Sequence, residues 1–258
     1  MNKKSNLGKN IIISGAGSGI GKETAKLLAK SEFNLILLGR NEQKLAETKY
    51  QIEESQPNST VAIYACDISS EKSIDECFLK IHKSFSKIFG LVNNAGINLA
   101  REDIVKTKVD DWKSVLETNL SGTYFLTKKT IPLMIKEKEG SIVNISSIAG
   151  ILGMKNRFSY SVTKSALLGF TRSISVDYAA HKIRSNCICP GYIKTPLTEK
   201  MINSLSKKDY QALVTKHPLG LGKELYVAEA IEFLLSEKSK WITGANIPVD
   251  GGYSLGRD

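Results

Sequence analysis

Short apolar runs alternate with longer segments in which apolar residues recur every three or four positions. The first three such pairs are residues 10–14 and 21–31, 34–39 and 42–55, and 60–66 and 71–85. This alternation predicts repeated strand–helix units, and near-continuous apolar strands predict a parallel sheet covered on both faces. Further strand-like runs follow near residues 88–94, 140–147, 183–190 and 246–250. We therefore predict an α/β fold with a doubly wound, seven-stranded parallel sheet and helices on both faces.

The series continues along all 258 residues without a linker, repeat or low-complexity segment. No separate substrate domain is expected, and residues 1–258 are predicted to form one domain. The longest irregular stretch, residues 192–222, follows the carboxyl end of a predicted strand. Long loops at that edge of an open α/β sheet commonly cover a ligand, so we expect a substrate lid built from short helices.

A glycine-rich loop, SGAGSGIG, joins the first predicted strand to its helix at residues 14–21. Glycine permits positive φ and close backbone approach, so amide hydrogens and a helix N-terminus can face a pyrophosphate. The strand–loop–helix context favours a Rossmann-type dinucleotide site over a bare tight turn. The expected contacts are Gly15, Ser18, Gly19, Ile20 and Gly21.

The end of the second predicted strand indicates which dinucleotide is bound. In Rossmann-type sites an acid there binds the ribose 2′-hydroxyl of NAD, whereas an arginine accommodates the 2′-phosphate of NADP. Gly39 stands where the acid is expected, and Arg40 follows it. A guanidinium can form two parallel hydrogen bonds with a phosphate, so the sequence favours NADP(H). The alternative is a solvated arginine at the start of a helix.

Tyr160 and Lys164 stand four positions apart in a segment that otherwise indicates a buried helix, residues 159–170. Residues at this spacing share a helix face. A nearby ammonium lowers the pKa of a phenol from its usual value of about 10. We therefore expect Tyr160 to have a lowered pKa and to exchange a proton with a reacting oxygen. The alternative is a half-buried tyrosine beside a lysine that extends to solvent.

Seven motifs occur in a fixed order along the chain: SGAGSGIG, LVNNAG, NLSGTYF, IVNISSIAG, YSVTK, CPGYIKTP and ITGANIPVDGG. Together they span nearly the whole chain and resemble the short-chain dehydrogenase/reductase superfamily. The resemblance implies a Rossmann-like NAD- or NADP-dependent oxidoreductase with an Asn-Ser-Tyr-Lys tetrad. Ser146 and Ser147 are both candidates for its serine, but the family's serine lies 13 positions before the tyrosine, which selects Ser147. The implied tetrad is Asn119, Ser147, Tyr160 and Lys164.

The resemblance also implies a role for each tetrad residue. Ser147 would hold a substrate carbonyl oxygen and Tyr160 would protonate it, which suits the charge that develops there. Lys164 would also contact the nicotinamide ribose, and Asn119 would help to hold a water through which protons are replenished. No metal is expected. The resemblance implies further cofactor contacts at Asp67, Ile68, Asn94, Ala95, Gly96, Tyr160, Pro190, Gly191, Ile193 and Thr195.

Within the superfamily the chain most resembles 3-oxoacyl-[acyl-carrier-protein] reductases. This implies NADPH-dependent reduction of a ketone to a secondary alcohol, with a 3-oxoacyl thioester on an acyl carrier protein as one candidate substrate. The alternatives are an alcohol, sugar or polyol dehydrogenase and a non-catalytic protein that senses dinucleotides. Carrier-protein users tend to have basic residues where this chain has Lys138 and His181, although arginines would be more typical. Candidates for the substrate pocket, besides Ser147, are Ile97, Ile148, Met154 and Tyr192, with lid and core packing as the alternative.

Composition and charge exclude several other functions. The formal net charge of +10 comes from scattered lysines and arginines without a basic stripe, so nucleic-acid binding is not expected. With 41% hydrophobic and 24% charged residues the composition is typical of a globular protein. The apolar run 11–13 is too short for a signal peptide, so we expect a cytoplasmic protein without a membrane segment. The four cysteines lack metal-site spacing and are expected to be buried thiols, and the family resemblance implies a homo-oligomer, often a tetramer.

Overall fold

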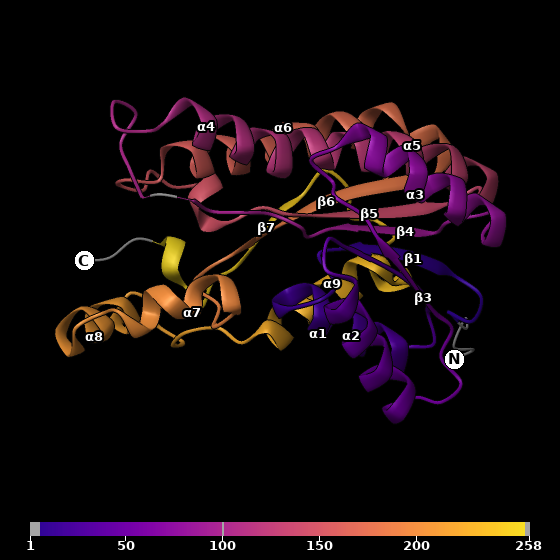
Figure 1. The fold of residues 1–258 in the computed structure, drawn as a ribbon, viewed down its shortest axis with the longest axis horizontal. Helices are drawn as coiled ribbons and strands as arrows, with labels where there is room; N and C mark the ends of the chain where they lie inside the picture. The colour runs from indigo at the N-terminus through magenta and orange to yellow at the C-terminus, as the bar shows by residue number, and fades with distance from the viewer. Residues whose placement is uncertain (1–5, 100, 256–258) are drawn as a thin grey trace.

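Parallel strands form a seven-stranded sheet at the centre of the computed structural model, which describes residues 6–99 and 101–255 (Figure 1). The strand order is β3-β2-β1-β4-β5-β6-β7. The predicted strand number and the single doubly wound sheet are therefore confirmed within the described residues. The strands are β1 (Asn10–Ser14), β2 (Asn34–Gly39), β3 (Val61–Ala65), β4 (Gly90–Asn93), β5 (Gly140–Ile145), β6 (Ile183–Pro190) and β7 (Asn246–Val249).

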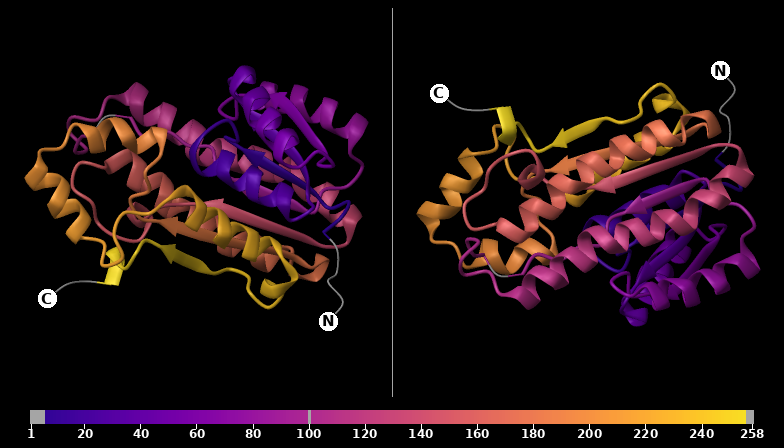
Figure 2. Two further views of the ribbon diagram at one scale, coloured as in Figure 1. Left: turned by 90° about the horizontal axis from the view of Figure 1, so that it is seen from below. Right: turned by 90° about the horizontal axis from the view of Figure 1, so that it is seen from above.

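Helices cover both faces of the sheet, with α1, α2 and α9 on one face and α3, α4, α5 and α6 on the other (Figures 1 and 2). Successive strand residues point to opposite faces, so Ile11 and Ile13 pack toward the first helix layer and Ile12 toward the second. The helices are α1 (Gly19–Lys30), α2 (Glu42–Ser55), α3 (Glu71–Ser84), α4 (Val109–Leu116), α5 (Gly122–Glu137), α6 (Phe158–Asp177), α7 (Pro196–Asn203), α8 (Lys207–Thr215) and α9 (Glu224–Leu235). No helix in these ranges is long and apolar enough to cross a membrane.

The chain changes direction within the sheet at β1. From β1 it proceeds outward to β2 and β3, and it then returns to add β4 on the other side of β1. Helices that follow β1 and β4 therefore lie on opposite faces, which leaves a crevice at the carboxyl ends of these two strands. The candidate site lies in this crevice.

The predicted lid contains two short helices, α7 and α8, that extend beyond the sheet (Figure 1). Its two ends are joined by a bridge between Ile193 and Gly222. Gly222 N donates to Tyr192 O at 3.0 Å, and Lys194 N donates to Gly222 O at 3.1 Å. The lid thus begins and ends at one fixed point beside β6.

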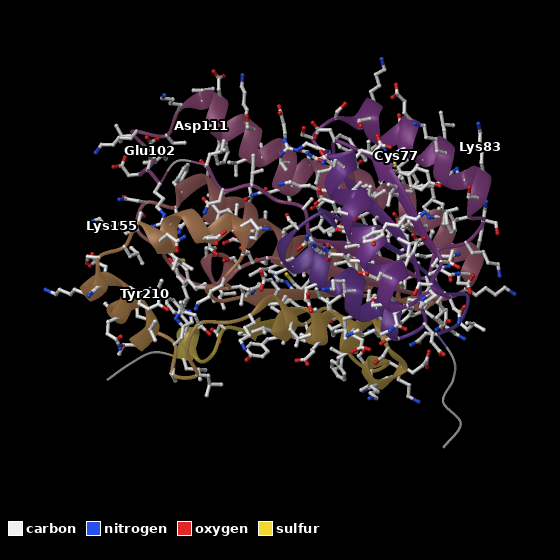
Figure 3. The ribbon with its side chains drawn as sticks, turned by 60° about the horizontal axis from the view of Figure 1, so that its bottom comes forward. Cys77, Lys83, Glu102, Asp111, Lys155 and Tyr210 are labelled. Carbon is white, nitrogen blue, oxygen red and sulfur yellow. The ribbon has the colours of Figure 1, made fainter. Side chains whose placement is uncertain are left out.

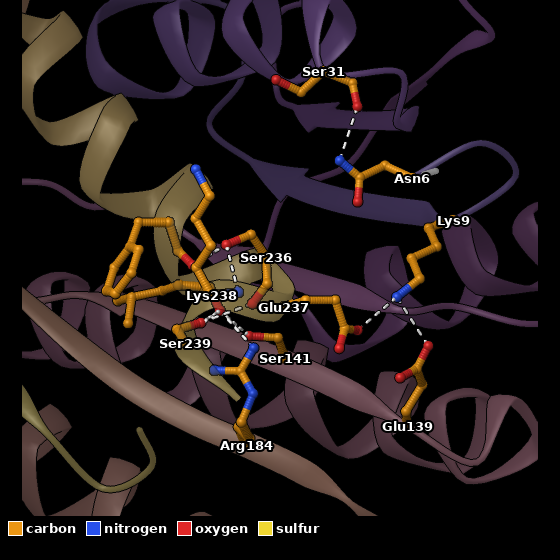
Figure 4. A network of polar contacts seen from close by, with 12 residues as sticks. Asn6, Lys9, Ser31, Glu139, Ser141, Arg184, Ser236, Glu237, Lys238 and Ser239 are labelled. Carbon is orange, nitrogen blue, oxygen red and sulfur yellow. Dashed lines mark hydrogen bonds and ion pairs between the residues drawn. The ribbon is translucent and has the colours of Figure 1, made fainter. Parts of the chain in front are cut away.

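A network of polar contacts lies at the amino ends of the strands, opposite the crevice at their carboxyl ends (Figure 4). Arg184 Nη2 and Ser141 Oγ donate to the carbonyl oxygen of Leu234 at 2.7 and 2.8 Å. Lys9 pairs with Glu139 at 2.9 Å and with Glu237 at 3.5 Å. These bonds hold the end of α9 against β5 and β6, far from the crevice along the strands.

Replacing Arg184 with alanine should destabilise the protein without changing its chemistry. The change removes a charge-assisted hydrogen bond and the packing of the half-buried side chain, so we expect the free energy of unfolding to fall by about 1–3 kcal/mol. Urea denaturation measures this loss. Lys240→Ala, at an exposed position in the same region, should change the free energy of unfolding by less than about 0.5 kcal/mol. Equal stability of Arg184→Ala and the unsubstituted protein would show that the network contributes nothing.

Candidate active site

A cavity of about 370 Å³ occupies the crevice at the carboxyl ends of the strands. Most of the predicted cofactor residues line it: Gly15, Ser18, Gly19, Ile20, Arg40, Asp67, Ile68, Asn94, Ala95, Gly96, Pro190, Gly191, Ile193 and Thr195. Ser147, Tyr160 and Lys164 line the same cavity. The structure therefore brings residues from seven separate segments of the sequence to one site.

The glycine loop packs so tightly that side chains cannot be added at two positions. Gly15 has a φ of +67°, and a Cβ atom there would lie 2.9 Å from Asn94 Nδ2. A Cβ on Gly21 would overlap the carbonyl oxygen of Gly15. Gly21 does not line the cavity, and it lets α1 approach the loop closely. Its cofactor contact stays a prediction. Asn94 fixes the loop from β4, because its Nδ2 donates to Ser14 O at 3.0 Å.

Two exposed cations stand at the end of the cavity beyond β2. Arg40 follows the strand directly, and Lys44 lies in the first turn of α2. Asn41 caps this helix by accepting a hydrogen bond from Lys44 N at 2.9 Å, which sets the position of both residues. Arg40 was predicted from the sequence, whereas Lys44 was not. A helix-capping Asn three residues before a lysine was the signal that placed Lys44 on the cavity side.

Ser147 and Ser146 have different environments, which separates the two candidates. Ser146 is buried, and its hydroxyl donates to Lys164 O at 2.7 Å. Ser147 is half-buried at the start of a 3₁₀ turn, Ile148–Gly150, and its Oγ accepts a hydrogen bond from Ala149 N at 3.1 Å. Ser147 therefore keeps a hydroxyl proton to donate into the cavity, whereas the proton of Ser146 is already engaged.

Lys164 is buried beneath Tyr160 on α6, with 4% of its surface exposed. Its Nζ donates to Ile145 O at 2.7 Å and lies 5.6 Å from the centre of the Tyr160 ring. Burial disfavours the charged amine and lowers the pKa of Lys164 to about 8. The ammonium is thus held by the end of β5, directly below the cavity.

The expected lowering of the Tyr160 pKa is wrong for this structure. Burial of the phenol raises its pKa, and this outweighs the opposing effects of the Ser147 side chain and of Arg157. Lys164 is itself desolvated and directed toward a carbonyl, so it is not among the groups that lower the value. Tyr160 is therefore a protonated phenol at neutral pH, which is the form that can donate a proton.

Asn119 lies in a short π-helical segment, Glu117–Ser121, between α4 and α5. It is 1% exposed and does not line the cavity. Its side chain accepts a hydrogen bond from Ile97 N at 2.8 Å and donates to Ile97 O at 2.9 Å. Asn119 Nδ2 also lies 3.2 Å from Thr163 Oγ1. These bonds fix Ile97 at the cavity wall, while the expected water-holding role of Asn119 stays a prediction.

The substrate-pocket candidates do not gather in one place. Ile97 lines the cavity, but Met154 and Tyr192 do not, and Ile148 is buried. Tyr192 packs edge-on against His217, with ring centres 5.7 Å apart. His217 in turn contacts Tyr253 at 4.7 Å. These rings join β6, the lid and the chain's last described turn. Thr118, Leu197 and Thr198 also line the cavity, from the π-helical segment and α7, and were not predicted from the sequence.

The described residues fit a dinucleotide. The glycine loop offers backbone in place of side chains at the start of α1, where a helix N-terminus attracts a phosphate. Arg40 and Lys44 lie at one end of the cavity, and Ser147, Tyr160 and Lys164 lie at the other. An elongated cofactor bound between them would present its reactive end to a hydroxyl donor and an acid. The fold and site thus define a dinucleotide-binding oxidoreductase.

Similarity to known proteins identifies the family within this class of oxidoreductases. A family model described as enoyl-(acyl carrier protein) reductase matches residues 15–254. The chain is 36% identical over 247 residues to the 3-oxoacyl-[acyl-carrier-protein] reductase FabG of Thermotoga maritima, covering 95% of this chain and 97% of the relative. It is 35% identical over 243 residues to the 3-oxoacyl-[acyl-carrier-protein] reductase of Bos taurus, covering 93% of this chain and 96% of the relative.

Solved structures agree with this placement. Levodione reductase superposes with a TM-score of 0.93 at 28% identity, over 97% of this chain and 99% of that one. ElxO with NADP bound superposes with a TM-score of 0.88 at 35% identity, over 96% of this chain and 99% of that one. The chain therefore belongs to the short-chain dehydrogenase/reductase family, and it is an oxidoreductase.

Proposed function

We propose that this protein reduces a ketone to a secondary alcohol with NADPH. One observation carries the proposal: a single cavity joins two cations, Arg40 and Lys44, to a hydroxyl donor, Ser147, and a protonated phenol, Tyr160. The cations suit the 2′-phosphate that distinguishes NADPH from NADH. The hydroxyl and phenol suit an oxygen that gains negative charge and then a proton.

Each residue has a defined part in this reaction. Bound NADPH supplies the hydride. Ser147 donates a hydrogen bond to the carbonyl oxygen, and Tyr160 transfers its proton to that oxygen as charge develops. Lys164, which lines the cavity and whose Nζ is held by Ile145 O, would contact the nicotinamide ribose. Asn119 and Asn94 are positioning residues. Asn119 fixes Ile97 at the cavity wall by hydrogen bonds, and Asn94 fixes the glycine loop in the same way.

The substrate is a carbonyl compound, for which a 3-oxoacyl thioester is the first candidate. Support comes from relatives named 3-oxoacyl-[acyl-carrier-protein] reductase. The two positions considered for carrier-protein contacts, Lys138 and His181, lie just before β5 and β6. They are therefore at the opposite edge of the sheet from the cavity, and a carrier protein docked there on one chain would not face its own active site. The cytoplasmic location and the tetramer expected from the family also stay predictions.

A spectroscopic assay tests the proposal. The purified protein is mixed with NADPH or NADH and with acetoacetyl thioester, simple ketones or sugars, and the nicotinamide absorbance is followed. We expect consumption of NADPH with at least one ketone or thioester. Absence of NADPH consumption with every carbonyl, in a protein that binds NADPH, would refute the proposed reaction and favour the non-catalytic alternative.

Removing Arg40 and Lys44 should reduce the preference for NADPH. Arg40→Gln and Lys44→Gln each delete one exposed cation beside the cavity, so each should weaken NADPH binding by roughly 10-fold while NADH binding changes little. Fluorescence titration with each nucleotide measures the dissociation constants. Lys30→Gln, an exposed lysine at the far end of α1, is the matched control. Equal weakening of NADPH and NADH binding would contradict a contact with the 2′-phosphate.

A further inference from the structure

His217 joins the returning end of the lid to the wall of the cavity, and the proposed reaction does not use it. It lies two residues after α8, and 3% of its surface is exposed. Its Nε2 accepts a hydrogen bond from Tyr192 N at 3.2 Å, and its Nδ1 lies 3.0 Å from Leu213 O in the last turn of α8. His217 therefore ties the end of this helix to the chain just after β6.

These two contacts define the state of the imidazole ring of His217. A backbone N–H can only donate, so Nε2 carries no hydrogen and is the acceptor. In the neutral ring the hydrogen is then on Nδ1, which donates it to Leu213 O. Ring contacts with Tyr192 and Tyr253 hold the imidazole in this orientation. Both nitrogens of the buried ring thus fix backbone groups.

The returning end of the lid holds Tyr192 through both of its backbone groups. His217 accepts from its N–H, and Gly222 N donates to its carbonyl oxygen at 3.0 Å. Gly191 and Ile193, the residues on either side of Tyr192, both line the cavity. The lid therefore sets the path of the chain at this part of the cavity wall.

This part of the wall lies at the end of the cavity that holds the proton donor. β6 is the neighbour of β5 in the sheet, and β5 ends two residues before Ser147. β2, which leads to Arg40, is separated from β5 by β1 and β4. In the proposed orientation of the cofactor, Gly191 and Ile193 thus lie on the nicotinamide side of the site.

The peptide between Gly191 and Tyr192 links His217 to this wall. The peptide bond is trans, so its carbonyl points away from the N–H that His217 holds. A half-buried N–H that loses its acceptor is costly, and rotation of the peptide toward another partner would relieve that cost. Such a rotation would displace Gly191 and Ile193 at the cavity wall.

The other end of this connection is the outer part of the lid. Every residue of α8 is at least partly exposed, so the packing of this helix against the rest of the protein is limited. Figure 3 shows Tyr210, on α8, at the same end of the molecule as Lys155, which lies in the segment before α6. A movement of α8 is passed to the cavity wall through His217.

We propose that His217 is a positioning residue for hydride transfer. Through the peptide between Gly191 and Tyr192 it fixes the nicotinamide side of the cavity wall, and through α8 it couples that wall to the lid. This inference rests on the proposed function. It gives the returning end of the lid a part in the geometry of the reaction.

Two nucleotides that differ in the nicotinamide test this positioning. NADPH and 2′-phospho-ADP-ribose, which lacks the nicotinamide, are titrated by calorimetry into the unsubstituted protein and into His217→Phe. Phenylalanine keeps a ring but has no acceptor, so we expect NADPH to bind roughly 5- to 10-fold more weakly and 2′-phospho-ADP-ribose to change by less than about twofold. Equal effects on the two nucleotides, or no effect on either, would overturn the inference.

Two further variants separate the acceptor from the ring and from folding. The side-chain amide of His217→Gln can place an oxygen where Nε2 lies, so it should restore most of the NADPH binding. The shorter amide of His217→Asn reaches only the place of Nδ1, so NADPH binding should stay weak. Lys216→Gln, at the exposed neighbouring position, should change the binding of neither nucleotide. Equal binding by His217→Gln and His217→Asn would contradict the part assigned to Nε2.

Hydrogen exchange distinguishes failure of this inference from failure of the proposed reaction. The Tyr192 amide, followed by NMR, should exchange slowly in the unsubstituted protein and at least roughly 10-fold faster in His217→Phe, while the amides of β1 stay unchanged. Equal exchange of the Tyr192 amide in the two proteins overturns the inference whether or not a carbonyl is reduced. With a ketone that is turned over, kcat should fall by roughly 10- to 100-fold in His217→Phe. An unchanged kcat would refute the positioning role while the proposed reaction stands.

Discussion

Tyr160→Phe should lower kcat for ketone reduction by roughly 10²- to 10⁴-fold, because the substitution removes the proton donor and leaves the ring in place. The pKa of Tyr160 is raised by burial, so the phenol is protonated at neutral pH and is ready to donate. Phenylalanine keeps the ring in the cavity wall and the other cofactor residues are unchanged, so the dissociation constant for NADPH should change by less than about threefold. Steady-state kinetics and nucleotide titration measure the two quantities separately.

The raised pKa gives this prediction a second readout. The phenol stays protonated through neutral and mildly alkaline pH, so loss of the Tyr160 proton should not reduce the rate of ketone reduction below pH 10 in the free enzyme. Ser161→Ala is the matched control, since it removes the next hydroxyl of α6, which has no hydrogen-bond partner among the described residues. Near-normal turnover by Tyr160→Phe would show that another group protonates the product.

Lys164→Met should abolish most of the activity. In the absence of cofactor, the same substitution should raise the free energy of unfolding. Lys164 is 4% exposed, and burial lowers its pKa from 10.5 to about 8. In the unfolded chain the ammonium is solvated, so below pH 8 the folded state carries a cost that a buried methionine avoids. At about 1.4 kcal/mol per pKa unit, less the lost hydrogen bond to Ile145 O, we expect a gain of about 1–3 kcal/mol at pH 7.

The pH dependence of that gain has a definite sign. As pH rises from about 8 toward 10.5, folded Lys164 is already neutral while the unfolded chain loses its proton, so the cost disappears. The stability advantage of Lys164→Met should therefore shrink over this window and vanish above it. Denaturant unfolding at pH 7, 9 and 10.5 measures the change, with Lys30→Met as an exposed-lysine control. A variant less stable than the unsubstituted protein at pH 7 would contradict the cost assigned to the buried ammonium.

The sheet and the cofactor-binding residues of the cavity were predictable from the sequence, because each is indicated by a short stretch of neighbouring residues. An apolar run such as Ile11–Ile13 predicts a covered strand wherever it occurs. The glycine loop and Arg40 follow strands directly, so their positions at the carboxyl edge follow from the parallel fold. Lys44 was missed because its placement depends on the start of α2, which is set by the Asn41 cap.

The protonation states of Tyr160 and Lys164 and the residues of the substrate pocket depend on tertiary packing. The spacing of residues in the sequence does not reveal that packing. The spacing of Tyr160 and Lys164 predicted a shared face correctly, but it did not show that Lys164 would be buried and directed to Ile145 O. Met154 and Tyr192 do not line the cavity, and the Tyr192 ring packs against His217 and Tyr253 instead.

Transfer of a deuteride from NADPH to the substrate tests the central claim most directly. NADPH carrying deuterium at both C4 positions of its dihydronicotinamide is incubated with the protein and with a ketone or thioester that the assay identifies. We predict one deuterium on the carbinol carbon of the alcohol product, detected by mass spectrometry, and at most about 1% as much deuterated alcohol with Tyr160→Phe over the same time. An alcohol without deuterium, or consumption of NADPH without an alcohol, would contradict hydride transfer to a carbonyl at this site.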